Sequence, residues 1–474
     1  MKTFYWHDYE TSGIHPARDR PIQFAGVRTN EQLEIIGEPL VEYCQPPLDS
    51  LPHPMACQVT GITPQYAMEQ GLSEPEFIQR IHSELAAPGT CGVGYNSIRF
   101  DDEVTRYTLY RNFFDPYQRE WQNGNSRWDI IDMVRMTRAL RPEGINWPDY
   151  DDGSANFRLE YLTAANGIGH ESAHDALSDV LATIELTRLI RLKQPRLYEY
   201  VLEHKSKQQV SRLVNLFNPK PFLHVSSRLP RDNGYVGVML PLAIHPTNNN
   251  AVICFNLVGD AEALVNQDAE QLRELLFTPT EQLGEGQPRL MLKAVHLNRC
   301  PIVATVKLLD SQSAKRLNID ISTCESRWQV LRDLDLGDKV RKIFAEPFAN
   351  SVNDPEQQLY DGFPDNADKS LFEQIRVMSS DELASNPPRF QDKRYRELLF
   401  LYRARNYPET LSAVEKEQWL SHRKQRILQG SDGYLSLEEF QIQLAALESP
   451  QPQLVESLRA WADYLTRDFT ESVN

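Results

Sequence analysis

The sequence predicts an α/β protein in which a mixed β-sheet comes first, a small β-barrel follows and helices complete the chain. Three observations lead to this prediction. A chain of 474 residues is too long for a single hydrophobic core. Its early part mixes strand-like runs with helical periodicity, its middle part alternates apolar and polar residues, and its last part is helical. The expected domains are residues 1–195, 196–347 and 352–474.

Residues 1–195 are expected to form the α/β domain. The aromatic run Thr3–Thr11 favours a first strand, because aromatic side chains suit a pleated sheet. Pro195 disfavours helix at Gln194 and marks the end of this domain. Further strands are expected at Pro21–Thr29, Glu34–Tyr43 and Cys91–Tyr95, and helices at Glu74–Ala86, Asp129–Leu140, Leu159–Asn166 and Asp175–Leu192.

The middle and last domains differ in their residue patterns, which predict strands in the middle domain and helices in the last. Alternating residues predict strands of a small barrel at Lys220–Ser226, Tyr235–Ile244, Ala251–Val258 and Leu292–Val306, with helical insertions at Ala261–Phe277 and Glu325–Leu334. Residues 349–368 are rich in Asn, Asp, Pro and Gln, which is typical of a linker. Beyond it, helices are expected at Leu371–Val377, Tyr395–Arg405, Ala413–Leu428, Leu437–Leu447 and Leu454–Leu465.

The composition indicates a cytoplasmic protein that does not associate with membranes. Hydrophobic residues make up 41% of the chain and charged residues 24%, as in ordinary globular proteins. No apolar run is long enough to span a bilayer, and the first strand follows Met1-Lys2 directly, which leaves no room for a signal peptide. Six cysteines are scattered without C-x-x-C spacing, so we expect reduced thiols and neither a metal cluster nor a disulfide framework.

The net charge of −16 argues against indiscriminate binding to nucleic acids. Residues 196–345 are the part of the chain in which basic side chains outnumber acidic ones. An acidic first domain is still compatible with a nucleic-acid substrate if metal ions offset its carboxylates and the basic middle domain holds the strand.

Two carboxylates in the first strand are the strongest functional signal. Asp8 and Glu10 are separated by one residue, and alternate residues of a strand face the same side. Two like charges this close are unfavourable unless a cation lies between them. Ligation by oxygen alone suits hard ions such as Mg²⁺ or Mn²⁺.

Three downstream residues extend this pair into a set. Asp101 follows the expected strand Cys91–Tyr95 at the start of a helix, and His174 precedes Asp179 by five residues. Five helical residues at ~100° each would leave His174 and Asp179 ~140° apart, so His174 must lie before the helix, with Asp175 near its N-cap.

The set suits phosphodiester hydrolysis by two metal ions. Asp8 is expected to bridge both ions, Glu10 and Asp179 to hold the nucleophile-side ion, and Asp101 the leaving-group-side ion. His174 is the expected general base, because an imidazole with a pKa of ~6.5 removes protons near neutrality.

The pattern D-x-E, N-x-x-x-F-D, H-x-x-x-x-D resembles the histidine-bearing branch of the DEDD exonuclease superfamily. Further blocks resemble bacterial exonuclease I. This similarity extends over nearly the whole chain. They are His7–Thr11, Tyr95–Arg106, Asn125–Asp129, Leu140–Pro148, Gln194–Leu197 and Leu401–Asn406. The resemblance implies a ribonuclease H-like exonuclease domain, an SH3-like middle domain and a helical C-terminal domain.

The same resemblance implies degradation of single-stranded DNA from its 3′ end to 5′-mononucleotides, in DNA repair and recombination. It implies two Mg²⁺ ions per active site, with Mn²⁺ as a substitute, and we expect a monomer. Aromatic residues near the acids can stack on unpaired bases. The expected substrate-binding residues are Glu10, Thr11, Phe100, Trp121, Trp128, Arg141, Glu143 and Arg158.

A protein partner is implied in the same way. Exonuclease I enzymes bind the acidic, phenylalanine-ending tail of single-stranded-DNA-binding protein. Such a tail needs a cation for its terminal carboxylate beside an apolar pocket for its ring. Lys220 and Arg332 occupy positions similar to the family's basic residues, and Gln441 is expected to contribute to the pocket wall.

Three other functions are disfavoured by the sequence. A DEDD-type 3′-to-5′ exoribonuclease is disfavoured because such chains are small single domains, and a DNA-binding adaptor with a dead site is disfavoured because all five site residues are present. His170–His174 also satisfies H-E-x-x-H, the zinc peptidase signature. That motif needs a helix, which the preceding residues Asn166–Gly169 would break.

Overall fold

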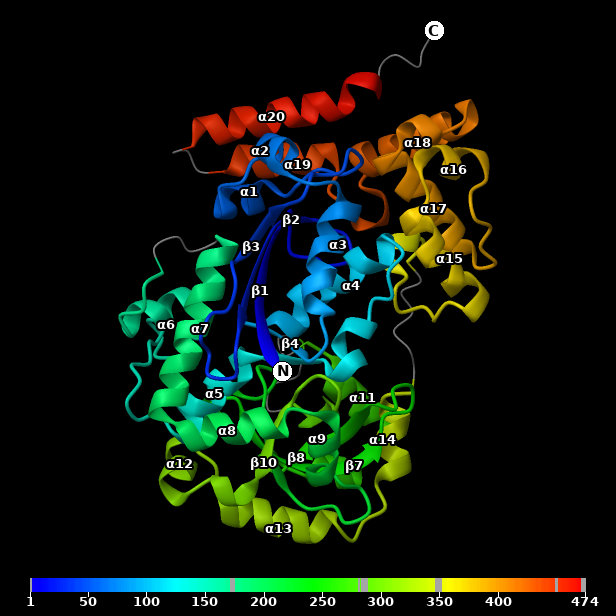
Figure 1. Cartoon of the computed structure of the whole chain (residues 1–474). Coiled ribbons are helices and arrows are strands. Elements are labelled where there is room, and N and C mark those ends of the chain that lie inside the picture. Colours follow the sequence, from blue (N-terminus) through cyan, green and yellow to red (C-terminus); the bar gives the residue numbers. More distant parts are fainter. Residues whose placement is uncertain are drawn as a thin grey trace. The chain divides into compact units, whose positions relative to one another are not determined.

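The computed structural model describes residues 2–170, 175–279, 282, 289–345, 352–447 and 451–469 (Figure 1). The chain divides into two compact units. The first consists of residues 1–127, 171–181 and 350–474, and the second of residues 128–170 and 182–349.

A five-stranded mixed sheet forms the centre of the first unit, with the strand order β3-β2-β1-β4-β5. Its middle strand, β1 (Thr3–Thr11), is antiparallel to β2 and parallel to β4. The other strands are β2 (Pro21–Thr29), β3 (Leu40–Tyr43), β4 (Thr90–Gly94) and β5 (Ser126–Asp129). The mixed sheet confirms the predicted fold class of the first domain.

The strand expected at Glu34–Tyr43 is shorter than predicted. Gly37 has a φ of 79°, a left-handed conformation that ends regular pairing, and Ile35 makes only an isolated bridge to Thr29. Regular pairing with β2 therefore begins at Leu40.

Four helices of the first unit come from the N-terminal part of the chain. They are α1 (Pro54–Thr60), α2 (Pro64–Gln70), α3 (Glu74–Leu85) and α4 (Asp101–Arg111). α1 and α2 were not predicted; each has only seven residues and begins with proline, which is well tolerated at the first helical position.

α4 is buried on nearly all sides. Val104 and Leu109 pack into the cluster between the sheet and α3, whereas Tyr107 and Tyr110 pack into a second cluster with the C-terminal helices. This double burial explains why α4 lacks the polar stripe of a surface helix.

The predicted helical C-terminal part is confirmed and packs within the first unit. Figure 1 shows α19 and α20 beside α1 and α2; α1 contacts both α19 and α20, and α2 contacts α20. Leu51 and Cys57 share a core cluster with Phe440 and Leu458. The helices are α15 (Asn366–Val377), α16 (Ser380–Ser385), α17 (Lys393–Asn406), α18 (Ala413–Gln429), α19 (Leu437–Ala446) and α20 (Pro452–Thr466).

A buried ion cluster joins the N-terminal and C-terminal parts of this unit. Glu356 is fully buried and accepts hydrogen bonds of 2.6–3.0 Å from Arg20, Arg405 and Arg426. Asp49 accepts from Arg405 and Arg426, each at 2.7 Å. Burial alone would raise the pKa of Glu356, but the charges of the three arginines outweigh it and hold the pKa well below its ordinary value.

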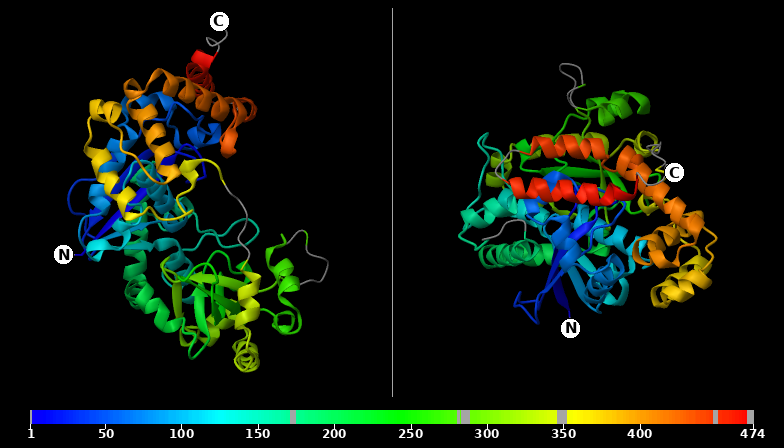
Figure 2. Two further views of the ribbon diagram at one scale, coloured as in Figure 1. Left: turned by 90° about the vertical axis from the view of Figure 1, so that its right-hand side faces the viewer. Right: turned by 90° about the horizontal axis from the view of Figure 1, so that it is seen from above.

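The second unit contains a five-stranded antiparallel sheet with the order β10-β6-β7-β8-β9, as expected for the predicted barrel (green in Figure 2). The strands are β6 (Phe222–Val225), β7 (Val236–Ile244), β8 (Ala251–Asn256), β9 (Leu292–His296) and β10 (Ile302–Thr305). The single strand predicted at Leu292–Val306 is wrong. A turn divides it into two, and Cys300 within that turn has a φ of 45°.

Helices surround this sheet. The insertion predicted at Ala261–Phe277 is two helices, because Asp268 caps the second one. The helices of this unit are α5 (Ile130–Leu140), α6 (Leu159–Ala165), α8 (Pro195–His204), α9 (Lys207–Leu213), α10 (Glu262–Asn266), α11 (Ala269–Phe277), α12 (Ser311–Arg316), α13 (Ile321–Leu331) and α14 (Gly337–Ile343).

α7 (Ala176–Lys193) starts in the first unit and continues into the second. Within the described ranges, no helix has the length and apolar character needed to cross a membrane. Short 3-10 helices lie at Ser97–Arg99, Gln118–Glu120, Gln122–Gly124, Arg231–Asn233, Val306–Leu308, Pro355–Gln357, Pro408–Thr410, Ser431–Gly433 and Arg467–Phe469.

The ion cluster leads to a prediction about stability. We expect Glu356→Gln to reduce the free energy of unfolding by about 3–5 kcal/mol at pH 7, because it leaves three buried arginines without their shared carboxylate. A lowered folded pKa stabilises above the unfolded value of 4.5, and that contribution is lost as the pH falls through the folded pKa. The difference between wild type and variant should therefore be full above pH 4.5 and shrink below it.

Denaturant unfolding of both proteins at a series of pH values measures this. Glu42→Gln is the control, since Glu42 pairs with Arg80, whose side chain is 56% exposed. Its cost should stay below about 1 kcal/mol. Equal losses from the two substitutions would contradict the assigned role of Glu356.

Candidate functional site

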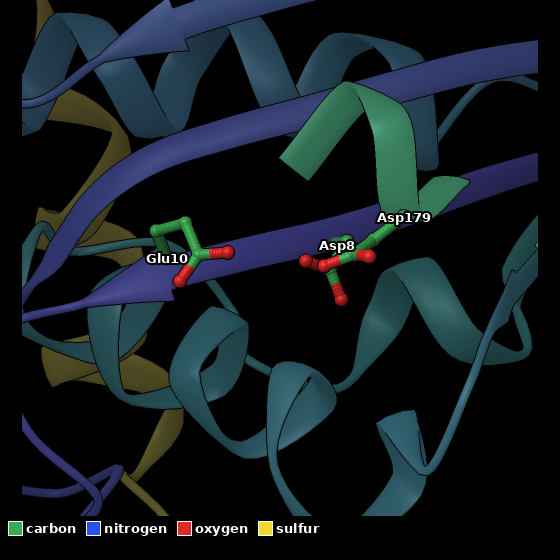
Figure 3. A group of neighbouring side chains, drawn as sticks. All are labelled: Asp8, Glu10 and Asp179. Atoms are coloured by element: carbon green, nitrogen blue, oxygen red, sulfur yellow. The ribbon is translucent and has the colours of Figure 1, made fainter. Parts of the chain in front are cut away.

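Three of the predicted acids form one compact group. Asp8, Glu10 and Asp179 each offer an oxygen, and these atoms all lie within 4.8 Å of one another. Figure 3 shows Asp8 and Glu10 projecting from β1, with Asp179 reaching them from α7. The alternation of β1 and the first turn of α7 therefore bring together residues that are far apart in the sequence.

Asp101 lies beside this group as the first residue of α4. Its side chain is 4% exposed, and its Oδ1 accepts a hydrogen bond of 3.1 Å from the backbone N–H of Tyr9. Thr105 donates to the carbonyl oxygen of Asp101 at 2.8 Å. The Asp101 carboxylate is thus held directly against β1, between the two acids of that strand.

The acids suppress one another's ionisation. Burial, followed by the charges of Asp101 and Asp179, raises the pKa of Asp8 well above its ordinary value. Burial and then Asp179 and Asp101 raise the pKa of Glu10 to about 8. A cation bound between these carboxylates would offset the repulsion among them. Because every donor is an oxygen, the residues fit a hard divalent metal ion.

The start of α7 agrees with the expectation that Asp175 lies near its N-cap. Asp175 caps the helix: its Oδ2 accepts from the N–H of Ser178 at 3.2 Å, and α7 begins at Ala176. His174 itself lies outside the described residues, so its role stays a prediction. His170 is described; it lies outside any helix and its Nδ1 is 3.1 Å from Thr163 Oγ1.

Asp175 was not predicted as part of the acid environment. Its charge raises the pKa of both Asp8 and Glu10. The available signal was its position beside His174 in the motif, although that position by itself indicates only a helix cap.

The reverse face of β1 carries a second buried assembly that the sequence did not indicate. Asp102 is bound by Arg119 at 2.7 Å and by Arg127 at 3.0 Å, and His7 Nε2 lies 4.0 Å from it. Burial alone would raise the pKa of Asp102, but Arg127 and Arg119 hold it below its ordinary value. Because Asp102 follows Asp101 in α4, these ion pairs fix the end of α4 that carries a site acid.

The residues of the first unit that are predicted to bind the DNA strand differ in the exposure of their side chains. Thr11 is buried and its Oγ1 donates to the carbonyl of Gly13 at 2.6 Å. Phe100 packs against the cluster between the sheet and α3. Trp121 is 64% exposed, which suits a surface on which an unpaired base stacks.

In the second unit, the prediction for Trp128 is wrong. This side chain is 1% exposed and packs on Tyr198, with ring centroids 5.7 Å apart, so it is a core residue and has no face for a base. Arg141 is 3.1 Å from Asp310, and the backbone carbonyl of Glu143 accepts from Gln194.

Arg158, the fourth predicted residue of this unit, has a side chain that is 64% exposed. Its nearest acidic partner, Glu160, is 3.9 Å away. An exposed guanidinium of this kind can contact a phosphate.

A cavity of about 490 Å³ opens in the second unit beside Lys220. Phe222, Ile321 and Trp328 supply apolar walls, and Lys307 and Arg212 add cations. The guanidinium of Arg332 lies over the Trp328 ring, 5.8 Å from its centroid. Arg332 thus contacts Trp328, which lines the same cavity as Lys220 and was not predicted. Gln441 is exposed in the first unit.

Known proteins match this chain over nearly its whole length. Family descriptions match in three places: exonuclease at residues 5–187, exonuclease I SH3-like domain at 205–346 and exonuclease I C-terminal domain at 353–467. Exodeoxyribonuclease I of Haemophilus influenzae is 47% identical over 428 residues, which is 90% of each chain. The Escherichia coli enzyme is 44% identical over 467 residues, 98% of each chain.

Solved structures agree. E. coli exonuclease I in complex with a dA16 oligonucleotide has a TM-score of 0.93 at 44% identity, covering 98% of this chain and 100% of that one. A zinc-bound E. coli complex with single-stranded DNA has a TM-score of 0.92 at 43% identity, and a complex of single-stranded-DNA-binding protein and exonuclease I with an inhibitor has 0.89 at 43%. Both cover 98% of this chain and 100% of the other.

The raised pKa values predict how metal ions affect stability. An acid whose folded pKa is about 8 instead of 4.5 binds protons more tightly when folded, so the metal-free protein should lose stability as the pH rises from 4.5 to 8. Mg²⁺ should reverse this loss, with a larger rise in melting temperature at pH 8 than at pH 6. At 100 times the dissociation constant the stabilisation should be ~2.7 kcal/mol.

Thermal unfolding with Mg²⁺ and with a chelator measures this. We expect Asp8→Asn to raise the metal-free melting temperature and to remove most of the Mg²⁺ response, because it relieves the repulsion and deletes a ligand. Asp152→Asn, which alters an exposed carboxylate, is the control. A full Mg²⁺ response in Asp8→Asn would show that the metal binds elsewhere.

Proposed function

Because the chain belongs to the exonuclease I family, we propose that it degrades single-stranded DNA from the 3′ end to 5′-mononucleotides, in DNA repair and recombination. One observation carries the proposal: Asp8, Glu10 and Asp179 converge in a chain 44% identical to an exodeoxyribonuclease I over 98% of its length. The activity requires a divalent metal ion, for which we propose Mg²⁺, with Mn²⁺ as a substitute.

Two metal ions, when bound, stabilise charge at the phosphorus and activate the attacking water. We assign Asp8 as the ligand of both, Glu10 and Asp179 to the nucleophile side, and Asp101 to the leaving-group side. The hydrogen bond from Tyr9 orients Asp101 for this task. His174, which precedes the capped start of α7, would take the proton from the attacking water.

The remaining contacts to DNA are proposed from exposure and position. Trp121 offers an open ring for a base. Glu10 is itself one of the acids, Thr11 follows it, and Phe100 precedes Asp101 in the sequence. Arg141, Glu143 and Arg158 would contact the strand from the second unit. We further propose domains at residues 1–195, 196–347 and 352–474, a monomeric state and a cytoplasmic location.

The alternatives are less well supported. A DEDD-type exoribonuclease is disfavoured because the H. influenzae and E. coli relatives are exodeoxyribonucleases, matched over 90% and 98% of their lengths. A DNA-binding adaptor is disfavoured because the four acids are in place. The peptidase alternative fails because His170 lies outside any helix.

Digestion of a 5′-labelled oligonucleotide tests the proposal. We expect Mg²⁺-dependent shortening of the single strand, release of 5′-mononucleotides and little action on the matching RNA. His174→Ala should slow turnover by roughly 10²–10⁴-fold, the usual contribution of a general base.

His170→Ala is the matched control and should change turnover little. Equal losses from the two histidine substitutions would remove His174 from its assigned role. Shortening without a divalent metal, or faster digestion of RNA than of DNA, would overturn the proposal itself.

We also propose that the cavity beside Lys220 binds the acidic, phenylalanine-ending tail of single-stranded-DNA-binding protein. A terminal carboxylate needs a cation next to an apolar wall, and here Lys220 and Lys307 line the same cavity as Phe222 and Trp328. Arg332 adds a cation at the Trp328 ring. Gln441 remains a proposed contact of the tail in the first unit.

Charge reversal tests the pocket. We expect Lys220→Glu and Arg332→Glu each to weaken binding of a synthetic tail peptide about tenfold, the effect of losing ~1.4 kcal/mol. Lys315→Glu, on the exposed surface of the same unit, should not affect affinity. Fluorescence anisotropy measures the affinities. Unchanged binding in both pocket variants would place the peptide elsewhere.

A further inference from the structure

Gln23 occupies an unusual position for a buried neutral side chain. It lies in β2 directly opposite Glu10 of β1 and is 1% exposed. Directly paired residues of antiparallel strands project from the same face of the sheet. The Gln23 side chain therefore shares the face on which the acids gather.

Both ends of the Gln23 amide contact the start of α7. Its Nε2 donates to Asp175 Oδ1 at 3.2 Å, and its Oε1 accepts from the N–H of Ala176 at 3.3 Å. A carboxylate can only accept and a backbone N–H can only donate, so one orientation of the amide satisfies both partners. A further hydrogen bond of 3.1 Å runs from Nε2 to Tyr43 of β3.

Asp175 transmits this contact to a site acid. Its backbone carbonyl accepts from the N–H of Asp179 at 3.0 Å, and its Oδ2 caps Ser178. Its other oxygen, Oδ1, is engaged by Gln23. Asp175 is thereby bound on both oxygens and stands outside the group of three acids with mutually close oxygens.

We propose that Gln23 is a positioning residue, which fixes the first turn of α7 so that Asp179 completes the metal-binding group with Asp8 and Glu10. The inference rests on the metal-binding role of these acids in the proposed function. The Gln23 amide donates to Asp175 and accepts from Ala176 with one side chain, whereas an ionised carboxylate at position 23 could only accept.

Gln23→Glu is the sharpest test, because it keeps the size of the side chain, removes the donor and sets a negative charge against Asp175. Partners that orient metal ligands typically contribute 10–100-fold to metal affinity. We expect the affinity for Mn²⁺, measured by titration calorimetry without DNA, to fall by about 10-fold or more. The Mg²⁺ concentration for half-maximal digestion should rise in parallel.

Gln65→Glu is the matched control. Gln65 lies in the same unit and its Nε2 donates to the carbonyl of Ser457 at 2.6 Å, so the exchange also removes a hydrogen bond from a Gln side chain. It should lower the melting temperature without changing the affinity for Mn²⁺. If Gln23→Glu behaves in the same way, Gln23 has only a structural role and the inference is wrong.

A double substitution provides the rescue. Asp175→Asn can still cap α7 and offers a donor to a carboxylate at position 23. In the Asp175→Asn background, Gln23→Glu should therefore cost much less Mn²⁺ affinity than in the wild type, which a double-mutant cycle quantifies. An equal cost in both backgrounds would show that the contact with Asp175 does not carry the effect.

The readout separates this inference from the proposed function. Mn²⁺ binding is measured without substrate, so a wild-type protein that binds Mn²⁺ but degrades no DNA would refute the function and leave the role of Gln23 open to the same test. Active enzyme with unaltered Mn²⁺ affinity in Gln23→Glu would refute the inference alone.

Discussion

Repulsion among the carboxylates at β1 sets what the surrounding strands and helices have to hold in place. Asp8, Glu10 and Asp179 are held close, and the pKa values of the first two are raised because burial and neighbouring charges oppose ionisation. Left to themselves these side chains would turn apart. The central place of β1 in the sheet, the burial of α4 and the capped start of α7 all resist that relaxation.

The same unit shows the opposite solution for other buried acids. Glu356 is as deeply buried as any site acid, yet three arginines lower its pKa. Asp102, next to Asp101 in the chain, is held in the same way by Arg119 and Arg127. Glu356 and Asp102 are paired with arginines and stabilise the fold. Asp8 and Glu10, whose pKa values are raised by neighbouring carboxylates, are suited to bind a metal ion. In this unit the direction of the pKa shift distinguishes Asp8 and Glu10 from Glu356 and Asp102.

The sequence was most informative where a local pattern has a local cause. β2 was predicted with its observed bounds, Pro21–Thr29, because a short, largely apolar run can be recognised as a strand without knowledge of its partners. The four acids could be predicted because their spacing fixes them on strand and helix ends. α1 and α2 were missed because seven-residue helices leave too few turns for periodicity.

What could not be predicted depends on contacts between distant residues. Gln23 and Asp175 are 152 positions apart, and neither forms a motif with the other. Trp128 was assigned to base stacking because an aromatic next to the acids in sequence can equally face solvent or the core. Trp328 was not predicted as a cavity residue, because it comes close to Lys220 only in the folded second unit.

The packing of α4 has a consequence for synthesis of the chain. Tyr107 and Tyr110 bury their rings against Phe372, Tyr395 and Tyr402, which the ribosome adds hundreds of residues later. Domains usually fold in the order of translation, but here the helix carrying Asp101 must wait for α15 and α17 before its outer face is covered. A chain cut short by an early stop codon would therefore be an incompletely folded protein with an exposed aromatic surface, a substrate for cellular proteases instead of an unregulated minimal nuclease.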